Sequence, residues 1–140
     1  MVVYSEENIL LRMENVSKNF NKSDGVFNRR KGTVKAVDDV TFSLHKGETL
    51  GLVGETGSGK STLGRLALRL LTPDSGRVVF DGVDITTLRQ RRIRPLRRKV
   101  QMVFQDPYGS LDPRKKVSSI IAEPMVVHGL WGKNSKRQVL

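Results

Sequence analysis

The chain has 140 residues, enough for one domain at most or a piece of one, and it has no cysteine, which excludes disulfides, thiolate metal sites and iron–sulfur ligation within it. Its composition, 37% hydrophobic and 28% charged, suits an α/β protein with a packed core, and no apolar run approaches the ~20 residues of a membrane span. The net charge of +11 indicates a polyanionic partner, unless a basic part has been counted apart from an acidic one.

Two strands are predicted before the most informative part of the chain. Residues 9–16 form an apolar run typical of an edge strand, and residues 34–44 alternate as a second strand does. The polar, basic segment 21–33 between them is predicted to be a loop or an insertion. His45 falls in the turn 45–48, where we expect a solvated side chain and no catalytic role.

Residues 48–71 have the pattern of a phosphate-binding loop between a strand and a helix. The apolar segment 48–53 predicts a buried strand, and residues 54–62 fit G-x-x-x-x-G-K-[ST]. Residues 60–71 predict a helix whose apolar face carries Leu63, Leu66, Leu70 and Leu71. Chance matches to this motif are rare in a chain of this length, and the strand–helix frame makes chance rarer still.

Each residue type in this loop has a chemical reason to be there. Gly54, Gly57 and Gly59 allow backbone angles that side chains forbid, so that successive N–H groups can surround an anion at the helix N-terminus. Lys60 supplies charge to the outer phosphates, and the Ser61 hydroxyl can ligate Mg²⁺. The predicted cofactor is therefore ATP or another nucleoside triphosphate with Mg²⁺, held by Gly54, Glu55, Thr56, Gly57, Ser58, Gly59, Lys60, Ser61 and Thr62.

The rest of the chain alternates short elements with turns. Residues 77–83 predict a strand ending at Asp81-Gly82, which we interpret as a tight turn, with a metal-binding carboxylate at Asp81 as the alternative. Two short basic helical pieces are expected at 88–94 and 95–99. A buried strand at 100–105, a loop at 106–114 and a helix at 117–127 that contains Pro124 are predicted to follow.

Basic residues gather at Arg29-Arg30-Lys31 and between Arg89 and Lys99. No aromatic residues interleave these runs, as they do on surfaces that bind single strands, so no specific nucleic acid is expected.

Several of these stretches together resemble the ATP-binding subunit of an ATP-binding cassette (ABC) importer of the oligopeptide/dipeptide group. Residues 51–63 match the P-loop of the cassette, and residues 100–114 match its Q-loop in the spelling of that group. The segments 15–20 and 35–40 match its N-terminal strands, and the basic insertion 25–31 is also similar. The fold implied is an α/β P-loop NTPase with an antiparallel β subdomain and the start of a helical subdomain.

The resemblance implies further roles. Phe20 would stack on adenine, although a half-buried residue at a strand end is the alternative. Gln105 would sense Mg²⁺ and the γ-phosphate, which makes Lys60 and Gln105 the catalytic candidates and Ser61 and Gln105 the metal candidates. Residues 106–114 would contact transmembrane permease subunits, a second cassette would pair as homo- or heterodimer, and the subunit would be peripheral at the cytoplasmic face of the membrane.

The resemblance covers only the first part of such a cassette. The signature motif, the Walker B Asp-Glu and the switch histidine do not occur in residues 1–140, so we expect an incomplete ATP-binding domain that binds ATP at best weakly and does not hydrolyse it usefully. The alternatives left open are a small-molecule or nucleotide kinase that uses Asp81 and a basic nucleic-acid-associated ATPase.

Overall fold

A computed structural model describes residues 8–21, 32–106, 109, 111–132 and 135. The chain divides into two compact units, 1–93 and 94–140, each described by itself.

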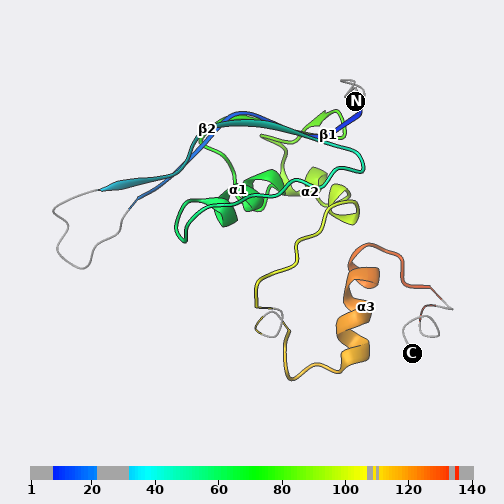
Figure 1. Ribbon diagram of the computed structural model, residues 1–140. Coiled ribbons are helices and arrows are strands. Elements are labelled where there is room, and N and C mark those ends of the chain that lie inside the picture. The colour runs from blue at the N-terminus through cyan, green and yellow to red at the C-terminus, as the bar shows by residue number, and fades with distance from the viewer. Residues whose placement is uncertain (1–7, 22–31, 107–108, 110, 133–134, 136–140) are drawn as a thin grey trace. The chain divides into compact units, whose positions relative to one another are not determined.

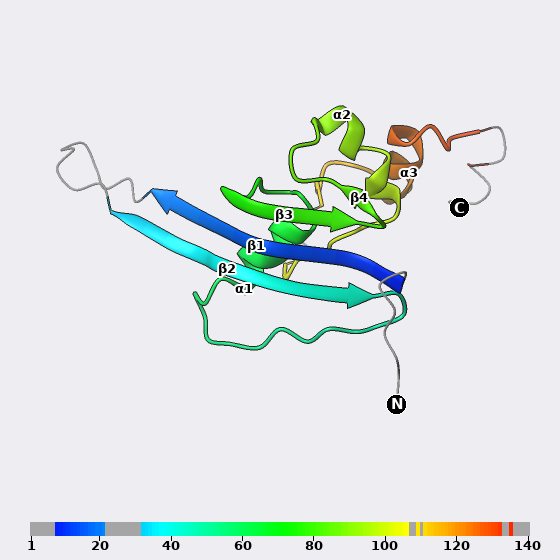
Figure 2. The ribbon, with the colours of Figure 1, turned by 90° about the horizontal axis from the view of Figure 1, so that it is seen from above.

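The first unit is built on a four-stranded antiparallel sheet (Figures 1 and 2). The strands, in the spatial order β2-β1-β3-β4, are β1 (Ile9–Asn21), β2 (Thr33–His45), β3 (Ser75–Phe80) and β4 (Val83–Asp84). The predicted antiparallel β subdomain is thus confirmed, and both N-terminal strands are longer than the sequence pattern indicated. β1 lies inside the sheet and not at its edge, because β3 pairs with it on the side away from β2.

A bulge in β1 keeps its apolar side chains on one face of the sheet. Met13 and Val16 are both fully buried, yet an odd spacing of three residues would place them on opposite faces of a regular strand. The register shifts between them, where Asn15 adopts a φ of 50°. Asn15 N–H donates to Thr41 Oγ1 at 2.8 Å, so β2 fixes the irregular segment.

The core lies between this sheet and the helix α1 (Lys60–Ala67), which covers one face of it (Figure 1). Leu63 and Leu66 are the buried residues of α1, as predicted for its apolar face. The other buried apolar residues of the core come from the strands and from the segment that follows the strands. They are Leu11, Met13, Val16, Val37, Val78, Phe80, Ile85 and Ile93.

Asp81 and Gly82 form the two-residue turn between β3 and β4. Both have positive φ, 48° and 75°, as the favoured hairpin turns require. Asp81 also pairs with Lys46 at 3.2 Å. The tight-turn interpretation is therefore confirmed in preference to a metal-binding strand end.

α1 is shorter than predicted, because the chain leaves helical geometry at Arg69, whose φ is 50°. Leu70 is exposed, contrary to the prediction, and Arg69 is the buried residue there. The Arg69 guanidinium donates to Ile85 O at 2.8 Å, to Thr72 Oγ1 at 2.8 Å and to Leu71 O at 3.2 Å. Three oxygen acceptors thus compensate for the loss of water around a buried cation.

Two predicted strands do not form. Residues 48–53 and 100–105 have no strand pairing, and Val53 and Val103 are 96% and 91% exposed. A strand needs a neighbour for its backbone N–H and C=O groups, and the described part of the chain supplies none to either segment. Both predictions of buried strands are thus wrong for this chain.

Short helical elements follow the sheet. α2 (Gln90–Ile93) closes the first unit, and η2 (Leu96–Arg98), preceded by Pro95, opens the second, which confirms the two predicted basic pieces. In the second unit α3 (Val117–Val127) contains Pro124, as expected. Arg94 donates to Val127 O at 3.1 Å and Arg98 donates to His128 O, so two guanidinium groups bind carbonyls at the end of α3.

The two valines of the β3–β4 hairpin offer a test of this core. Val78 is fully buried and Val83 is 47% exposed. Val78→Ala is expected to lower the free energy of unfolding by about 2 kcal/mol, and Val83→Ala by less than ~0.5 kcal/mol, since only the first removes buried methyl groups. Urea unfolding followed by circular dichroism measures both, and equal losses would contradict this placement of the core.

Candidate functional site

Of the phosphate-binding motif predicted at 54–62, residues 54–59 form a turn directly before α1, and residues 60–62 are the first turn of α1. Ser58 N–H donates to Glu55 O at 3.2 Å, and Gly57 and Gly59 have φ values of 86° and 93°. Side chains rarely adopt these angles, so Gly57 and Gly59 stand where the backbone requires glycine, whereas Gly54 does not have the positive φ that was predicted for it. Leu63 N–H donates to Gly59 O at 2.8 Å, which starts α1 at the end of the loop.

Gly59 also brings the loop against the sheet. A Cβ at Gly59 would lie 2.0 Å from the carbonyl oxygen of Ala36 in β2. Gly57 has nothing within 4 Å of the same position. The end of the loop next to α1 is therefore fixed by the close approach of two backbones. The motif alone gave no indication that Ala36 would be the residue in contact with Gly59.

Lys60, the first residue of α1, directs its ammonium group back into the loop. Nζ donates to Gly54 O at 2.6 Å, to Glu55 O at 2.5 Å and to Ser58 Oγ at 3.2 Å. A full positive charge is thus held at the helix N-terminus, where the helix dipole and free N–H groups also favour an anion. The role of Lys60 toward phosphate stays a prediction, since its three donors are directed at acceptors of the loop.

The residues present fit a nucleotide bound with Mg²⁺. Ser61 is exposed in the first turn of α1, beside Lys60, so its hydroxyl is accessible to a cation. Among the residues that the structure describes, no three His, Asp or Glu side chains gather to hold a metal. A cation here would therefore depend on Ser61, the phosphates of its nucleotide and water, the kind of site in which Mg²⁺ is found.

A hollow of about 430 Å³ adjoins the loop. One wall is β2, at residues 35–38 and Val40, and the other is formed by residues 52–54, 58–60 and Leu63. The lining of this hollow is largely apolar and includes Leu52 and Val53. These two residues belong to segment 48–53, which does not pair with the sheet.

Phe20 lies near the end of β1, opposite Val34 of β2, and is 41% exposed. One face of its ring is near Lys18 Nζ, 5.8 Å from the ring centroid. A half-exposed aromatic is compatible with either reading, adenine contact or a strand-end residue, so the role of Phe20 stays a prediction.

Asp74, which the motif search did not single out, fixes the strand before Phe20. Asp74 Oδ1 accepts from Lys18 Nζ at 2.6 Å, and Oδ2 accepts from Asn19 N–H at 2.7 Å. The Lys18 ammonium and the Asn19 N–H together hold the pKa of Asp74 below its usual value. Its only sequence signal was its place after Pro73, where the helix was expected to stop.

The prediction that the side chain of His45 is solvated is wrong. His45 is the last residue of β2, and its side chain is only 16% exposed and pairs with Glu48 at 3.0 Å. The His45 N–H and ring hold the pKa of Glu48 below its usual value.

Gln105 is exposed in the second unit, so its sensor and metal roles stay predictions. The predicted contact of residues 106–114 with permease subunits also stays a prediction, and residues 107, 108 and 110 lie outside the described residues. The resemblance at 25–31 also lies outside them.

A glycine loop directly before a helix, with a lysine as the first residue of that helix, is the defining feature of P-loop nucleotide-binding proteins. The profile of the ABC transporter family matches residues 37–139, so the chain belongs to the ABC transporter family. The predicted resemblance is confirmed.

Curated relatives agree with this assignment. The chain is 46% identical over 135 residues to the oligopeptide transport ATP-binding protein AppF of Bacillus subtilis and 47% identical over 131 residues to the glutathione import ATP-binding protein GsiA of Escherichia coli. These alignments cover 96% and 93% of the chain but 41% and 21% of the relatives, so the chain spans less than half of their length.

Solved structures confirm the fold class. The dimeric bacterial ABC transporter cassette MJ0796 superposes with a TM-score of 0.76 at 23% identity, over 92% of this chain and 53% of that one. CbiO1 of Clostridium perfringens, part of the complex CbiONQ, gives 0.66 at 27% identity, over 94% and 47%. The fold is that of an ABC cassette, a P-loop NTPase, present in part.

No helix among the described residues has the length and apolar character that crossing a membrane requires.

The contact between Gly59 and Ala36 predicts unequal effects of alanine in the loop. Gly59→Ala is expected to lower the free energy of unfolding by about 3 kcal/mol, because it adds a clash to an unfavourable φ. Gly57→Ala has the same φ penalty without the clash and is expected to cost about 1 kcal/mol. Chemical denaturation of the two variants measures the difference, and equal costs would show that the backbones are not in contact.

The pairing of Asp74 predicts a pH-dependent loss of stability in Asp74→Asn. A carboxyl whose pKa is lower in the folded state stabilises the fold above its unfolded pKa, near 4, and this contribution disappears as pH falls through the folded pKa. Asp74→Asn should therefore be less stable than the parent by up to about 1 kcal/mol at neutral pH, and the difference should shrink as pH falls below about 4. Thermal unfolding across this range checks the convergence. Asp38→Asn, which removes an exposed (i,i+3) pair with Lys35, is the matched control and should cost less than ~0.5 kcal/mol.

Proposed function

We propose that this chain is the ATP-binding part of an ABC transporter ATPase subunit that energises the import of oligopeptides, dipeptides or related small solutes. The family supports a transport ATPase, and the relatives named for oligopeptide transport and glutathione import support the class of solute. Peptides and glutathione share peptide bonds and free carboxylates, so the solute group is chemically coherent.

The observation that carries the proposal is the position of Lys60. Its ammonium is held within a glycine loop, at the N-terminus of α1, by Gly54 O, Glu55 O and Ser58 Oγ. The charge lies at the N-terminus of α1, where it would bind the outer phosphates of ATP in place of some of these acceptors. Electrostatic stabilisation of phosphate charge is the main contribution that a protein makes to phosphoryl transfer.

Other residues would complete the site. Ser61 would ligate Mg²⁺, which when bound would neutralise charge on the outer phosphates. The backbone at residues 54–59 and Thr62 would hold the inner phosphate, Phe20 would contact adenine, and Gln105 would sense the metal and the γ-phosphate.

The proposed partners follow from membership in a transport family. Residues 106–114 would contact transmembrane permease subunits, and a second ATP-binding subunit would pair with this one, at the cytoplasmic face of the membrane. The solved cassette MJ0796 is itself dimeric. Hydrolysis would be performed by the intact subunit, and residues 1–140 alone are expected to show no Lys60-dependent phosphate release.

Titration calorimetry of Mg-ATP tests the proposed site. Lys60→Ala is expected to weaken binding at least 30-fold, the equivalent of about 2 kcal/mol for a lost charge-assisted interaction. Lys46→Ala is the control, because Lys46 carries the same charge but pairs with Asp81 in a surface turn. Equal affinity in the parent and both variants would refute the proposed role of the loop.

A further inference from the structure

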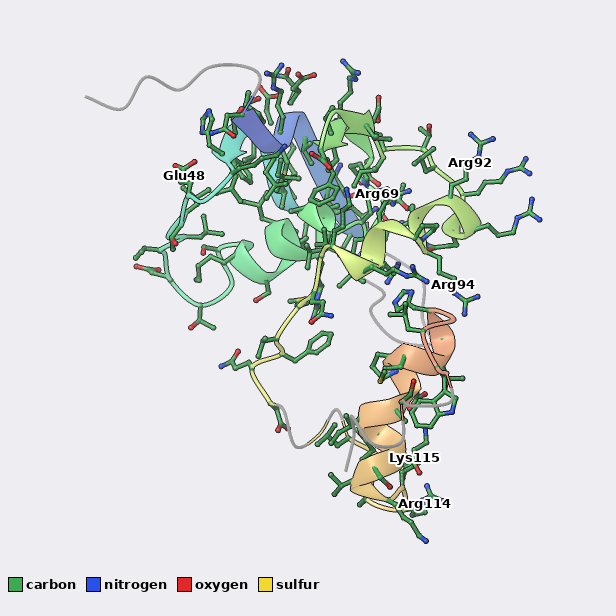
Figure 3. The ribbon with its side chains drawn as sticks, turned by 90° about the vertical axis from the view of Figure 1, so that its right-hand side faces the viewer. Glu48, Arg69, Arg92, Arg94, Arg114 and Lys115 are labelled. Carbon is green, nitrogen blue, oxygen red and sulfur yellow. The ribbon has the colours of Figure 1, made fainter. Side chains whose placement is uncertain are left out.

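Three exposed arginines stand together at the end of the first unit. Arg89 precedes α2, and Arg91 and Arg92 belong to it; all three side chains are exposed. Figure 3 shows the Arg92 side chain extending away from the protein at the end of this short helix. We call Arg89, Arg91 and Arg92 the arginine cluster.

The arginine cluster has no acidic residue close to it in sequence and no ion pair in the described structure. Residues 85–105 contain no Asp or Glu, and within the described ranges no carboxylate forms an ion pair with any of the three arginines. By contrast, Arg77 of the sheet is paired, because it contacts both Glu14, at 3.4 Å, and Asp84, at 3.1 Å. Uncompensated charge is thus concentrated at one place on the unit.

The fold holds this cluster in place. Ile93 and Ile85, on either side of it, are 2% and 4% exposed and pack into the core. Arg92 N–H and Ile93 N–H both donate to Arg89 O, at 2.8 and 3.2 Å, so the backbone of the cluster forms one turn. A shallow hollow of about 290 Å³ lies among the three arginines, Thr87 and Leu88, which places a partly apolar floor beside the guanidinium groups.

We propose that the arginine cluster binds the surface of an anionic phospholipid membrane, with headgroup phosphates on the guanidinium groups. Guanidinium pairs with phosphate through two parallel hydrogen bonds, and basic clusters beside a membrane bind anionic lipid through charge. This occupant fits a chain of a membrane transport family better than nucleic acid does, because residues 81–103 contain no aromatic side chain on which a base could stack. The proposal rests on the proposed function only for its location at a membrane.

Vesicle flotation with the whole 140-residue chain tests the proposal. The vesicles are phosphatidylcholine alone or an equimolar mixture of phosphatidylcholine and phosphatidylglycerol. The parent chain is expected to bind the anionic vesicles only, and to be released as salt is raised. The triple variant R89Q/R91Q/R92Q is expected to bind on the order of 100-fold more weakly, from about fivefold for each surface arginine.

Two matched variants separate the cluster from total charge and from arginine chemistry. R29Q/R30Q/K31Q removes the same three charges from a run outside the described residues and is expected to lose less than about tenfold. R89K/R91K/R92K keeps the charge but loses the paired hydrogen bonds, and its binding is expected to lie between those of the parent and the glutamine triple. Circular dichroism of each variant establishes that all are equally folded, as expected for changes at exposed positions.

The proposal is overturned if the two glutamine triples lose binding equally, if the lysine triple falls as far as the glutamine triple, or if neutral vesicles bind as well as anionic ones. Tighter binding to a single-stranded oligonucleotide than to anionic vesicles, dependent on the same arginines, would also overturn it. Mg-ATP titration of the same proteins reads the P-loop separately, so failure of nucleotide binding and failure of lipid binding are distinguishable.

Discussion

The contact between the Gly59 backbone and the Ala36 carbonyl is the constraint on which the site depends. At this point the loop, the start of α1 and the first part of β2 meet without any side chain between them. α1 can then place Leu63 and Leu66 against the sheet and Lys60 into the loop at the same time. The core and the site are therefore products of the same close approach, and a methyl group at Gly59 would disturb both.

The sequence predicted those parts of the chain whose signals are local. The loop 54–62, the Asp81-Gly82 turn, the basic helical pieces and α3 each depend on residues a few positions apart, and all of them form. The position of Lys60 in the loop could likewise be predicted, since the motif specifies both the glycines and the lysine. The sequence also contains a sign of the bulge at Asn15, because the apolar residues Met13 and Val16, both buried, are three positions apart.

What the sequence could not predict depends on partners distant along the chain. Residues 48–53 and 100–105 are apolar enough for buried strands, but a strand exists only where another strand pairs with it. Leu70 lies on the helical face of α1 by periodicity, yet the positive φ of Arg69 ends the helix first and buries a guanidinium bonded to Ile85 O. Asp74 belongs to the same class, because nothing around it in sequence indicates Lys18 and Asn19 as its partners.

The unequal lengths of the strands affect how a base would be bound. β3 pairs with β1 only from Leu11 to Ser17, so Phe20 lies on the part of the β1–β2 ribbon that extends past the third strand (Figure 1). Two-stranded ribbons twist more and are less stable than wider sheets. Asp74 fixes the strand as far as Asn19, but Phe20 itself lies beyond β3. A purine stacked on Phe20 would thus lose part of the stacking energy to the ordering of this end of the ribbon. The phosphates, bound by a loop fixed against β2, would dominate affinity, and adenine and guanine nucleotides would differ little in binding to this unit.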